Sequence, residues 1–105
     1  MAEITLSQAI HDAIAEEMRR DPTVVLIGEA VGPKSYGSST NEGIYEEFGP
    51  DRVRQTGIIE TVIGGGAVGA ALAGLRPIAE FLQWNFAVVD YDGITGKGGI
   101  WRYLP

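Results

Sequence analysis

The amino-acid sequence predicts an α/β fold in which helices flank a parallel β-sheet. Short aliphatic runs, which are typical of buried strands, alternate along the chain with segments of helical periodicity. The composition is globular, with 45% hydrophobic and 21% charged residues. A length of 105 residues suits one small unit, so we expect residues 1–105 to form a single partial domain.

The first helix is expected over residues 5–20. Its apolar residues recur three and four positions apart, which is the pattern of an amphipathic helix. Thr5 and Gln8 have the spacing of a capping box, and Asp21-Pro22 provides the stop.

Three strands are expected at 24–27, 53–56 and 76–81. The first is a β-branched and aliphatic run closed by Gly28, which indicates a strand buried on both faces. The second is the weakest of the three. Because helices separate these runs, the strands should pair in parallel.

A short helix is expected between the first two strands. Ser39 and Glu42 again have capping-box spacing, and the helix should run through Phe48. Gly49-Pro50 then ends it. The preceding residues, 32–40, are polar and turn-forming and indicate a loop.

Residues 61–75 are expected to form a helix made almost entirely of small side chains, with Gly74 as its left-handed cap. Gly65, Gly69 and Ala73 lie four apart and therefore share one face. Small residues at this spacing let another backbone approach closely. The helix packs either against its own sheet or against a partner helix from another subunit or domain.

The stretch 86–103 gives no firm prediction of secondary structure. Gly93, Gly96, Gly98 and Gly99 interrupt any helical pattern, and each costs about 1 kcal/mol relative to alanine.

The charge balance excludes some classes of function. The net charge is −6, whereas a nucleic-acid-binding surface normally shows a basic patch. The chain has no cysteine, which fits a reducing compartment. The amino terminus lacks the features of a secretory signal or a transit peptide, and the uncharged run is too short and glycine-rich to span a bilayer. We therefore expect a soluble protein of the bacterial cytoplasm rather than of the mitochondrial matrix.

Residues 64–69 satisfy the dinucleotide-binding pattern G-x-G-x-x-G. That pattern requires a strand just before it, a helix opening from it, and an acid about 20 residues further on. Glu80 comes too early and Asp90 too late for that acid. A dinucleotide site is therefore a minor alternative.

The same glycines resemble a second signature. Glu60, followed by Gly65, Gly69 and Ala70, is similar to the E-x4-G-Φ-x-x-G-Φ motif of thiamine-diphosphate enzymes, which lies on their pyrimidine-binding domain. Further segments match in order and spacing: IGEAVG (27–32), GIYEEFGPDRV (43–53), QTGIIE (55–60), GAALAGLRPIAEF (69–81) and WNF (84–86). Together they resemble the start of the β subunit of the decarboxylating component of 2-oxo acid dehydrogenases, of the pyruvate dehydrogenase type.

Several positions depart from that family pattern. The family usually shows T-P-I-x-E where this chain has residues 56–60, and a second acid where it has Ala30. Gly66 replaces an apolar side chain. Past Phe86 the family continues as a regular helix, whereas residues 93–99 here are rich in glycine. The family subunit is also much longer, and its catalytic histidine lies in the part that this chain does not contain.

The resemblance implies an enzyme role for Glu60. The glutamate at this position would hydrogen-bond N1′ of the aminopyrimidine of thiamine diphosphate and support proton transfer within the cofactor, which performs the decarboxylation. An apolar pocket formed by Ile58, Ile59, Val62 and Phe86 would favour the protonated form of Glu60. Ile58 and Phe86 are therefore expected to contact the cofactor. Glu29 would lie in a polar channel between two active sites.

The resemblance also implies partners. No G-D-G segment with a downstream asparagine is present, so Mg²⁺ and the diphosphate would be held mainly by an α-like subunit. We expect a heterotetramer-like assembly with a second copy of the chain, and acyl transfer to a lipoyl-bearing acyltransferase. The chain alone should be inactive, and it should hold no metal by itself.

Simpler interpretations remain open for each residue. Glu60 can be a carboxylate that favours a helix N-terminus, Glu29 a solvated loop acid, Phe86 an ordinary core residue and His11 a surface histidine. For the whole chain, the alternatives are a non-catalytic α/β interaction module that docks through its glycine-rich helix, and a fragment of a transketolase-type enzyme.

Overall fold

Three parallel strands form the centre of the structure, a computed structural model that describes residues 3–33 and 40–103. The strands are β1 (Val24–Gly28), β2 (Val53–Gln55) and β3 (Arg76–Glu80), and their order in the sheet is β2-β1-β3. Leu26 on the central strand is level with Val53 on one side and Ile78 on the other. The predicted parallel α/β class is confirmed, and each strand lies within two residues of its predicted bounds.

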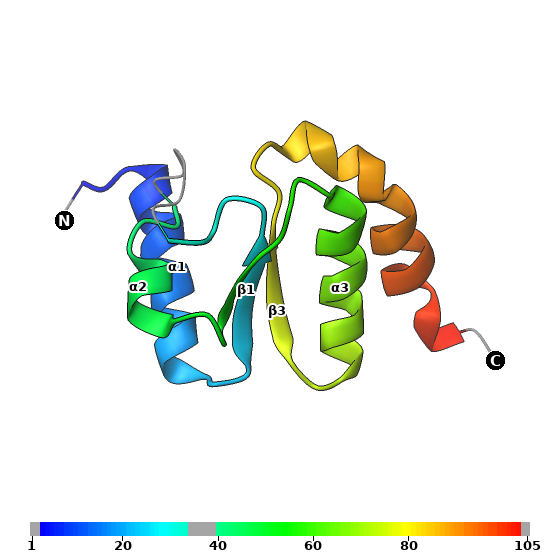
Figure 1. Ribbon diagram of the computed structural model, residues 1–105, viewed down its shortest axis with the longest axis horizontal. Helices are drawn as coiled ribbons and strands as arrows, with labels where there is room; N and C mark the ends of the chain where they lie inside the picture. Colours follow the sequence, from blue (N-terminus) through cyan, green and yellow to red (C-terminus); the bar gives the residue numbers. More distant parts are fainter. Residues whose placement is uncertain (1–2, 34–39, 104–105) are drawn as a thin grey trace.

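Helices cover both faces of this sheet (Figure 1). The helices α1 (Leu6–Arg20) and α2 (Ile44–Phe48) lie on one side, and α3 (Glu60–Leu72) lies on the other. No helix in the described part of the chain is long and apolar enough to cross a membrane.

The hydrophobic core lies between the sheet and the α1–α2 layer. Its buried members come from α1, from the first two strands, from the loop after β1 and from the start of α2: Ala15, Met18, Val24, Leu26, Val31, Ile44 and Val53. Ile78 of β3 packs against them from the edge of the sheet. The even-numbered residues of β1 therefore face α1, as the two-residue period of a strand requires.

The predicted start of α1 is confirmed. Thr5 is the N-cap, and its Oγ1 accepts a hydrogen bond of 3.1 Å from the backbone N of Gln8. The reciprocal half of the capping box is absent, because the Gln8 side chain donates to Asp12 Oδ1 at 2.7 Å instead.

The helix α2 begins later than the sequence indicates. Ser39 lies outside the described residues, and the helix opens at Ile44 after Gly43, which has a left-handed φ of 78°. No side chain caps it, so the capping-box prediction is wrong for the observed N-terminus. Its predicted end is confirmed, because Gly49 is the C-cap with φ of 74°.

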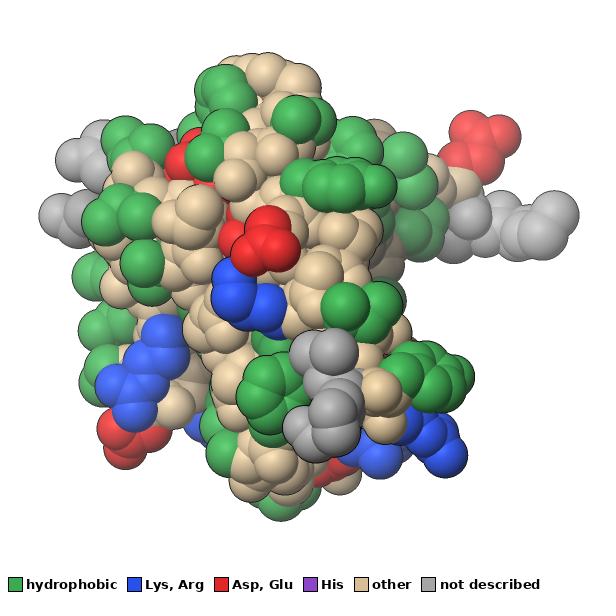
Figure 2. Space-filling view, turned by 90° about the vertical axis from the view of Figure 1, so that its right-hand side faces the viewer, with side chains coloured by type: hydrophobic (Ala, Val, Ile, Leu, Met, Phe, Trp, Pro, Cys, Tyr) green, Lys and Arg blue, Asp and Glu red, His purple; other side chains and the backbone are tan. Residues whose placement is uncertain are grey.

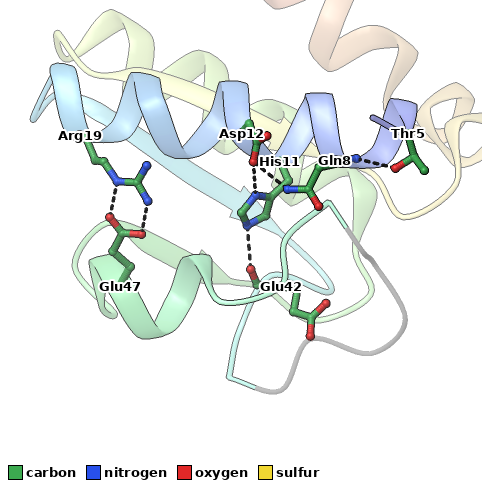
Figure 3. A network of polar contacts seen from close by, with 7 residues as sticks. All are labelled: Thr5, Gln8, His11, Asp12, Arg19, Glu42 and Glu47. Atoms are coloured by element: carbon green, nitrogen blue, oxygen red, sulfur yellow. Dashed lines mark hydrogen bonds and ion pairs between the residues drawn. The ribbon is translucent and has the colours of Figure 1, made fainter. Parts of the chain in front are cut away.

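Polar contacts join α1 to the α2 segment (Figure 3). Arg19 donates two hydrogen bonds, each of 2.6 Å, to the two carboxylate oxygens of Glu47. His11 contacts Asp12 at 3.1 Å through Nδ1 and the Glu42 carbonyl at 2.9 Å through Nε2. The His11 side chain is only 23% exposed. It is therefore a bridge between two elements rather than the free surface histidine that we expected.

Residues 84–103 form a C-terminal helical run, although their glycines gave no firm prediction. The run consists of a 3₁₀-helix (Trp84–Asp90), a π-helix (Asp92–Gly99) and a final 3₁₀ turn (Trp101–Tyr103). It packs on the outer side of α3, which is thus enclosed between the sheet and the run (Figure 1). The π-helical geometry of Asp92–Gly99 is consistent with the low helix propensity of its four glycines, whereas Trp84–Asp90 contains no glycine.

Asp90 occupies a slot between α3 and the C-terminal helical run. It is 3% exposed, and a Cβ placed on Gly64 or on Gly93 would overlap its carboxylate. Burial raises the pKa of Asp90; the charge of Lys97 opposes this rise, and that of Asp92 adds to it. Glycine is therefore required at positions 64 and 93, because the Asp90 carboxylate lies very close to both backbones.

Two neighbouring substitutions on α3 test this slot. Gly64→Ala should lower the free energy of unfolding by about 1–3 kcal/mol, because the added methyl overlaps Asp90. Gly65→Ala should raise it by up to about 1 kcal/mol, because a Cβ there meets nothing within 4 Å and alanine favours the helix. Denaturant titration of both variants provides the comparison.

The double variant Gly64→Ala/Asp90→Ala shows whether the overlap with Asp90 causes the loss of stability. It should recover most of the free energy of unfolding that Gly64→Ala loses. Equal stabilities of the two single variants, or no recovery in the double variant, would show that Asp90 does not fill this space.

Candidate functional site

The three strands end at the same edge of the sheet, where sites of parallel α/β proteins form. Their last residues are Gly28, Gln55 and Glu80. The Gln55 side chain accepts a hydrogen bond of 2.7 Å from the backbone N of Gly32, and it thereby ties the loop after β1 to the end of β2. This edge carries the polar groups from which a ligand site can be built.

Glu60 is the first residue of α3 and stands in its first turn. The N-cap is Ile59, which provides no side-chain hydrogen bond to the helix. Glu60 itself is half-buried and makes no hydrogen bond or ion pair with the described residues. Its carboxyl group therefore lies where the helix dipole favours an anion, and it keeps its hydrogen-bonding capacity for a ligand.

The apolar residues around Glu60 are largely exposed. Ile58 is 82% exposed, Ile59 50% and Val62 51%. They do not close a pocket over Glu60 within the described residues, so the walls expected from the sequence are not assembled by this part of the chain alone. Large exposed apolar side chains beside a polar group are typical of a surface that a ligand or partner covers.

Phe86 lies in the first turn of the 3₁₀-helix Trp84–Asp90, which packs on α3. The residue is half-buried, so both a core role and a ligand contact remain compatible with its position. Phe86 thus belongs to the same side of the sheet as Glu60.

Glu29 follows the last residue of β1 and is half-buried. The charge of Glu29 acts on Glu80, which forms a hydrogen bond with Asn41, and sequence reasoning assigned neither Glu80 nor Asn41 to the site. Burial raises the pKa of Glu80, the charge of Glu29 adds to this rise, and a hydrogen bond with Asn41 opposes it. The position of Glu80 at the end of a predicted strand could have identified it as a site residue. No local sequence pattern identifies Asn41.

The dinucleotide interpretation does not fit the structure. Residues 64–69 lie inside α3, which has already begun at Glu60, and not in a turn between a strand and a helix. Their backbone N–H groups are therefore used by the helix rather than exposed to a phosphate.

Metal-binding groups are not assembled in the described ranges. No cluster of three or more histidine, cysteine, aspartate or glutamate residues is placed there so as to hold an ion. The candidate site thus consists of one acid at a helix start, a pair of acids at the strand ends, and adjacent exposed apolar side chains.

These features define a parallel α/β fold with a candidate ligand site at the carboxyl edge of its sheet. Residues 2–103 match the family model described as transketolase, pyrimidine binding domain. The chain therefore belongs to the family of transketolase-type pyrimidine-binding domains.

Curated relatives are β subunits of a larger enzyme. The chain is 44% identical over 102 residues to the pyruvate dehydrogenase E1 component subunit beta of Rickettsia conorii, a match that covers 97% of this chain and 31% of that protein. It is 39% identical over 103 residues to the subunit of the same name from Chaetosphaeridium globosum, covering 98% and 32%. The mitochondrial subunit beta-1 of Oryza sativa is 39% identical over 102 residues, covering 97% and 27%. The chain thus spans about a third of the length of these relatives.

A substitution at the strand end tests how tightly the site is packed. A Cβ on Gly28 would lie 2.8 Å from the Glu80 carbonyl oxygen and 2.9 Å from Glu80 Cβ. Gly28→Ala should therefore lower the free energy of unfolding by about 1–3 kcal/mol. Gly57→Ala is the matched control, because its nearest contact would be an ordinary 3.7 Å to Ile59. Equal melting of the two variants in calorimetry would contradict the close pairing of β1 and β3.

Proposed function

We propose that this chain supplies the aminopyrimidine-binding half of a thiamine diphosphate site in a 2-oxo acid dehydrogenase of the pyruvate dehydrogenase type. The single observation that carries the proposal is the position of Glu60, unpaired at the start of α3 on the carboxyl edge of the sheet. Membership in the pyrimidine-binding family supports it. The named relatives support the dehydrogenase class.

The residues present fit an aminopyrimidine. The ring needs a carboxyl group that can share a proton with a ring nitrogen, and Glu60 has a free carboxyl group. It also needs apolar surfaces, which the exposed side chains of Ile58 and Val62 provide. Closure of the pocket over them would require a second protein surface. Thiamine diphosphate, when bound, supplies the electron sink for decarboxylation.

The protein would bind and orient the cofactor and hold a proton at its ring nitrogen. Glu60 would hydrogen-bond N1′ and hold a proton there, in a setting from which water is removed when the partner closes the pocket. Ile58 and Phe86 would pack on the pyrimidine. Glu29 would place a second acid at the same edge of the sheet.

The proposed partners are supported by the named relatives, which are β subunits. The diphosphate and its Mg²⁺ would be held mainly by an α-like subunit, and a second copy of the chain would complete a heterotetramer-like assembly. A lipoyl-bearing acyltransferase would accept the acyl group. The location would be the bacterial cytoplasm.

The part of α3 that neither the sheet nor the C-terminal helical run covers favours close assembly. A Cβ on Gly65, Gly66 or Gly69 would meet nothing within 4 Å, so this part of the helix is open. Exposed hydrophobic side chains lie on the adjacent C-terminal helical run, and Figure 2 shows hydrophobic groups spread over that side of the molecule. The same surface would serve the alternative function, a non-catalytic interaction module.

The role of Glu60 is tested by Glu60→Gln in the enzyme assembled with its α-like partner. Glutamine keeps the shape and a hydrogen bond but cannot exchange a proton with N1′. Exchange of the C2 proton of thiamine diphosphate, followed by quenched-flow NMR, should slow by about 10²- to 10⁴-fold. Cofactor affinity should fall only modestly, because the diphosphate and metal are held elsewhere.

Glu46→Gln is the control for this experiment, since Glu46 is an exposed acid on α2. With Glu46→Gln, the C2 proton of thiamine diphosphate should exchange at the wild-type rate. Wild-type exchange in Glu60→Gln would reduce Glu60 to a carboxylate that merely favours the helix N-terminus.

The open face of α3 is tested by Gly69→Leu. The isolated chain should keep its far-ultraviolet spectrum, because a side chain at this position has space. Association with partner subunits should weaken by at least about tenfold, because a large side chain blocks close helix approach. Sedimentation measures assembly. Unchanged assembly would show that the face is not an interface.

A further inference from the structure

Two acids lie together where β1 and β3 end. Gly28 is level with Glu80 in the parallel register, and Glu29 is the next residue after Gly28. A Cβ on Gly28 would lie 2.9 Å from Glu80 Oε2. The Glu80 carboxyl group therefore bends over the strand end that presents Glu29.

Both carboxyl groups have a buried oxygen that lacks a donor. Oε2 of Glu29 and Oε2 of Glu80 are inaccessible to solvent and have no hydrogen-bond partner among the described residues. A buried carboxylate oxygen without a donor is costly, and two of them close together repel each other. A proton retained on Glu80 removes the repulsion between the two charges.

Asn41 fixes the position of Glu80. It is 1% exposed, comes from the segment before α2, and forms a hydrogen bond with Glu80. Among the described residues, Glu29 is the charged group that acts on Glu80, and no cation there opposes it. The neighbourhood is therefore arranged to favour a retained proton rather than an ion pair.

We propose that Glu29 and Glu80 form a carboxyl pair at the carboxyl ends of β1 and β3, in which Glu80 retains a proton. The pair itself is a property of this fold. Its relation to a cofactor rests on the proposed function, in which Glu29 and Glu60 lie at the same edge of the sheet.

The pair has a direct consequence for pH dependence. Folding raises the pKa of Glu80 above its ordinary value of 4.5, first through burial and then through the charge of Glu29. The native state therefore binds this proton more tightly than the unfolded state does. As pH rises from the ordinary value through the raised one, Glu80 should reduce the stability of the fold.

The test is ¹³C NMR titration of the glutamate carboxyl groups in this chain without cofactor. The Glu80 signal is assigned by its loss in Glu80→Gln. In the wild type, the Glu80 signal should titrate above 4.5, because burial and the charge of Glu29 both raise the pKa of Glu80. In Glu29→Gln the pKa of Glu80 should fall while staying above 4.5, since burial remains.

Glu42→Gln is the matched control, because Glu42 is an exposed acid near the same segment. It should leave the Glu80 curve unchanged. Stability measured against pH should show a smaller loss above 4.5 in Glu80→Gln than in the wild type.

A wild-type pKa of Glu80 at or below its ordinary value of 4.5 would overturn the proposal without the use of any variant. So would an identical Glu80 curve in Glu29→Gln. Neither result would contradict the proposed function, which depends on Glu60 and is tested in the cofactor-loaded assembly.

Discussion

The parallel register of β1 with β3 is the constraint on which the rest of the structure depends. It sets Gly28 beside Glu80 and ends both strands at one edge of the sheet. Because β2 is parallel as well, the chain that leaves it toward α3 starts from this same edge. Glu60, Glu29 and Glu80 come from different parts of the sequence, and this pairing gathers them at one end of the sheet.

The glycines of the chain serve two distinct physical needs. Gly28 and Gly64 are sites of close approach, where a methyl group would meet Glu80 or Asp90. Gly65 and Gly69 are open on α3, and nothing within the described residues requires them. Glycine lowers helix stability, so an open glycine in a helix is a cost that only an external contact offsets. The close-approach glycines are explained by contacts within the fold. The open glycines of α3 indicate a contact with another molecule.

The sequence predicted the elements with local signals and missed contacts between distant segments. Strand runs, the Thr5 cap and Gly74, which has φ of 96°, were all readable from neighbouring residues. The bridge from His11 to Glu42, the burial of Asp90 and the contact of Asn41 with Glu80 join segments whose proximity depends on the folded topology. Glu60 could be identified because its spacing to Gly65 and Gly69 forms a motif, whereas Glu80 carried no such mark.

The central claim is that Glu60 presents a carboxyl group to N1′ of an aminopyrimidine. The most direct measurement is the ¹⁵N chemical shift of N1′ in labelled thiamine diphosphate bound to the enzyme assembled with its α-like partner. With wild-type chain the shift should be that of a nitrogen sharing a proton with a carboxyl group, and with Glu60→Gln it should move to the value of an unprotonated ring nitrogen. The same N1′ shift in both proteins would contradict the account.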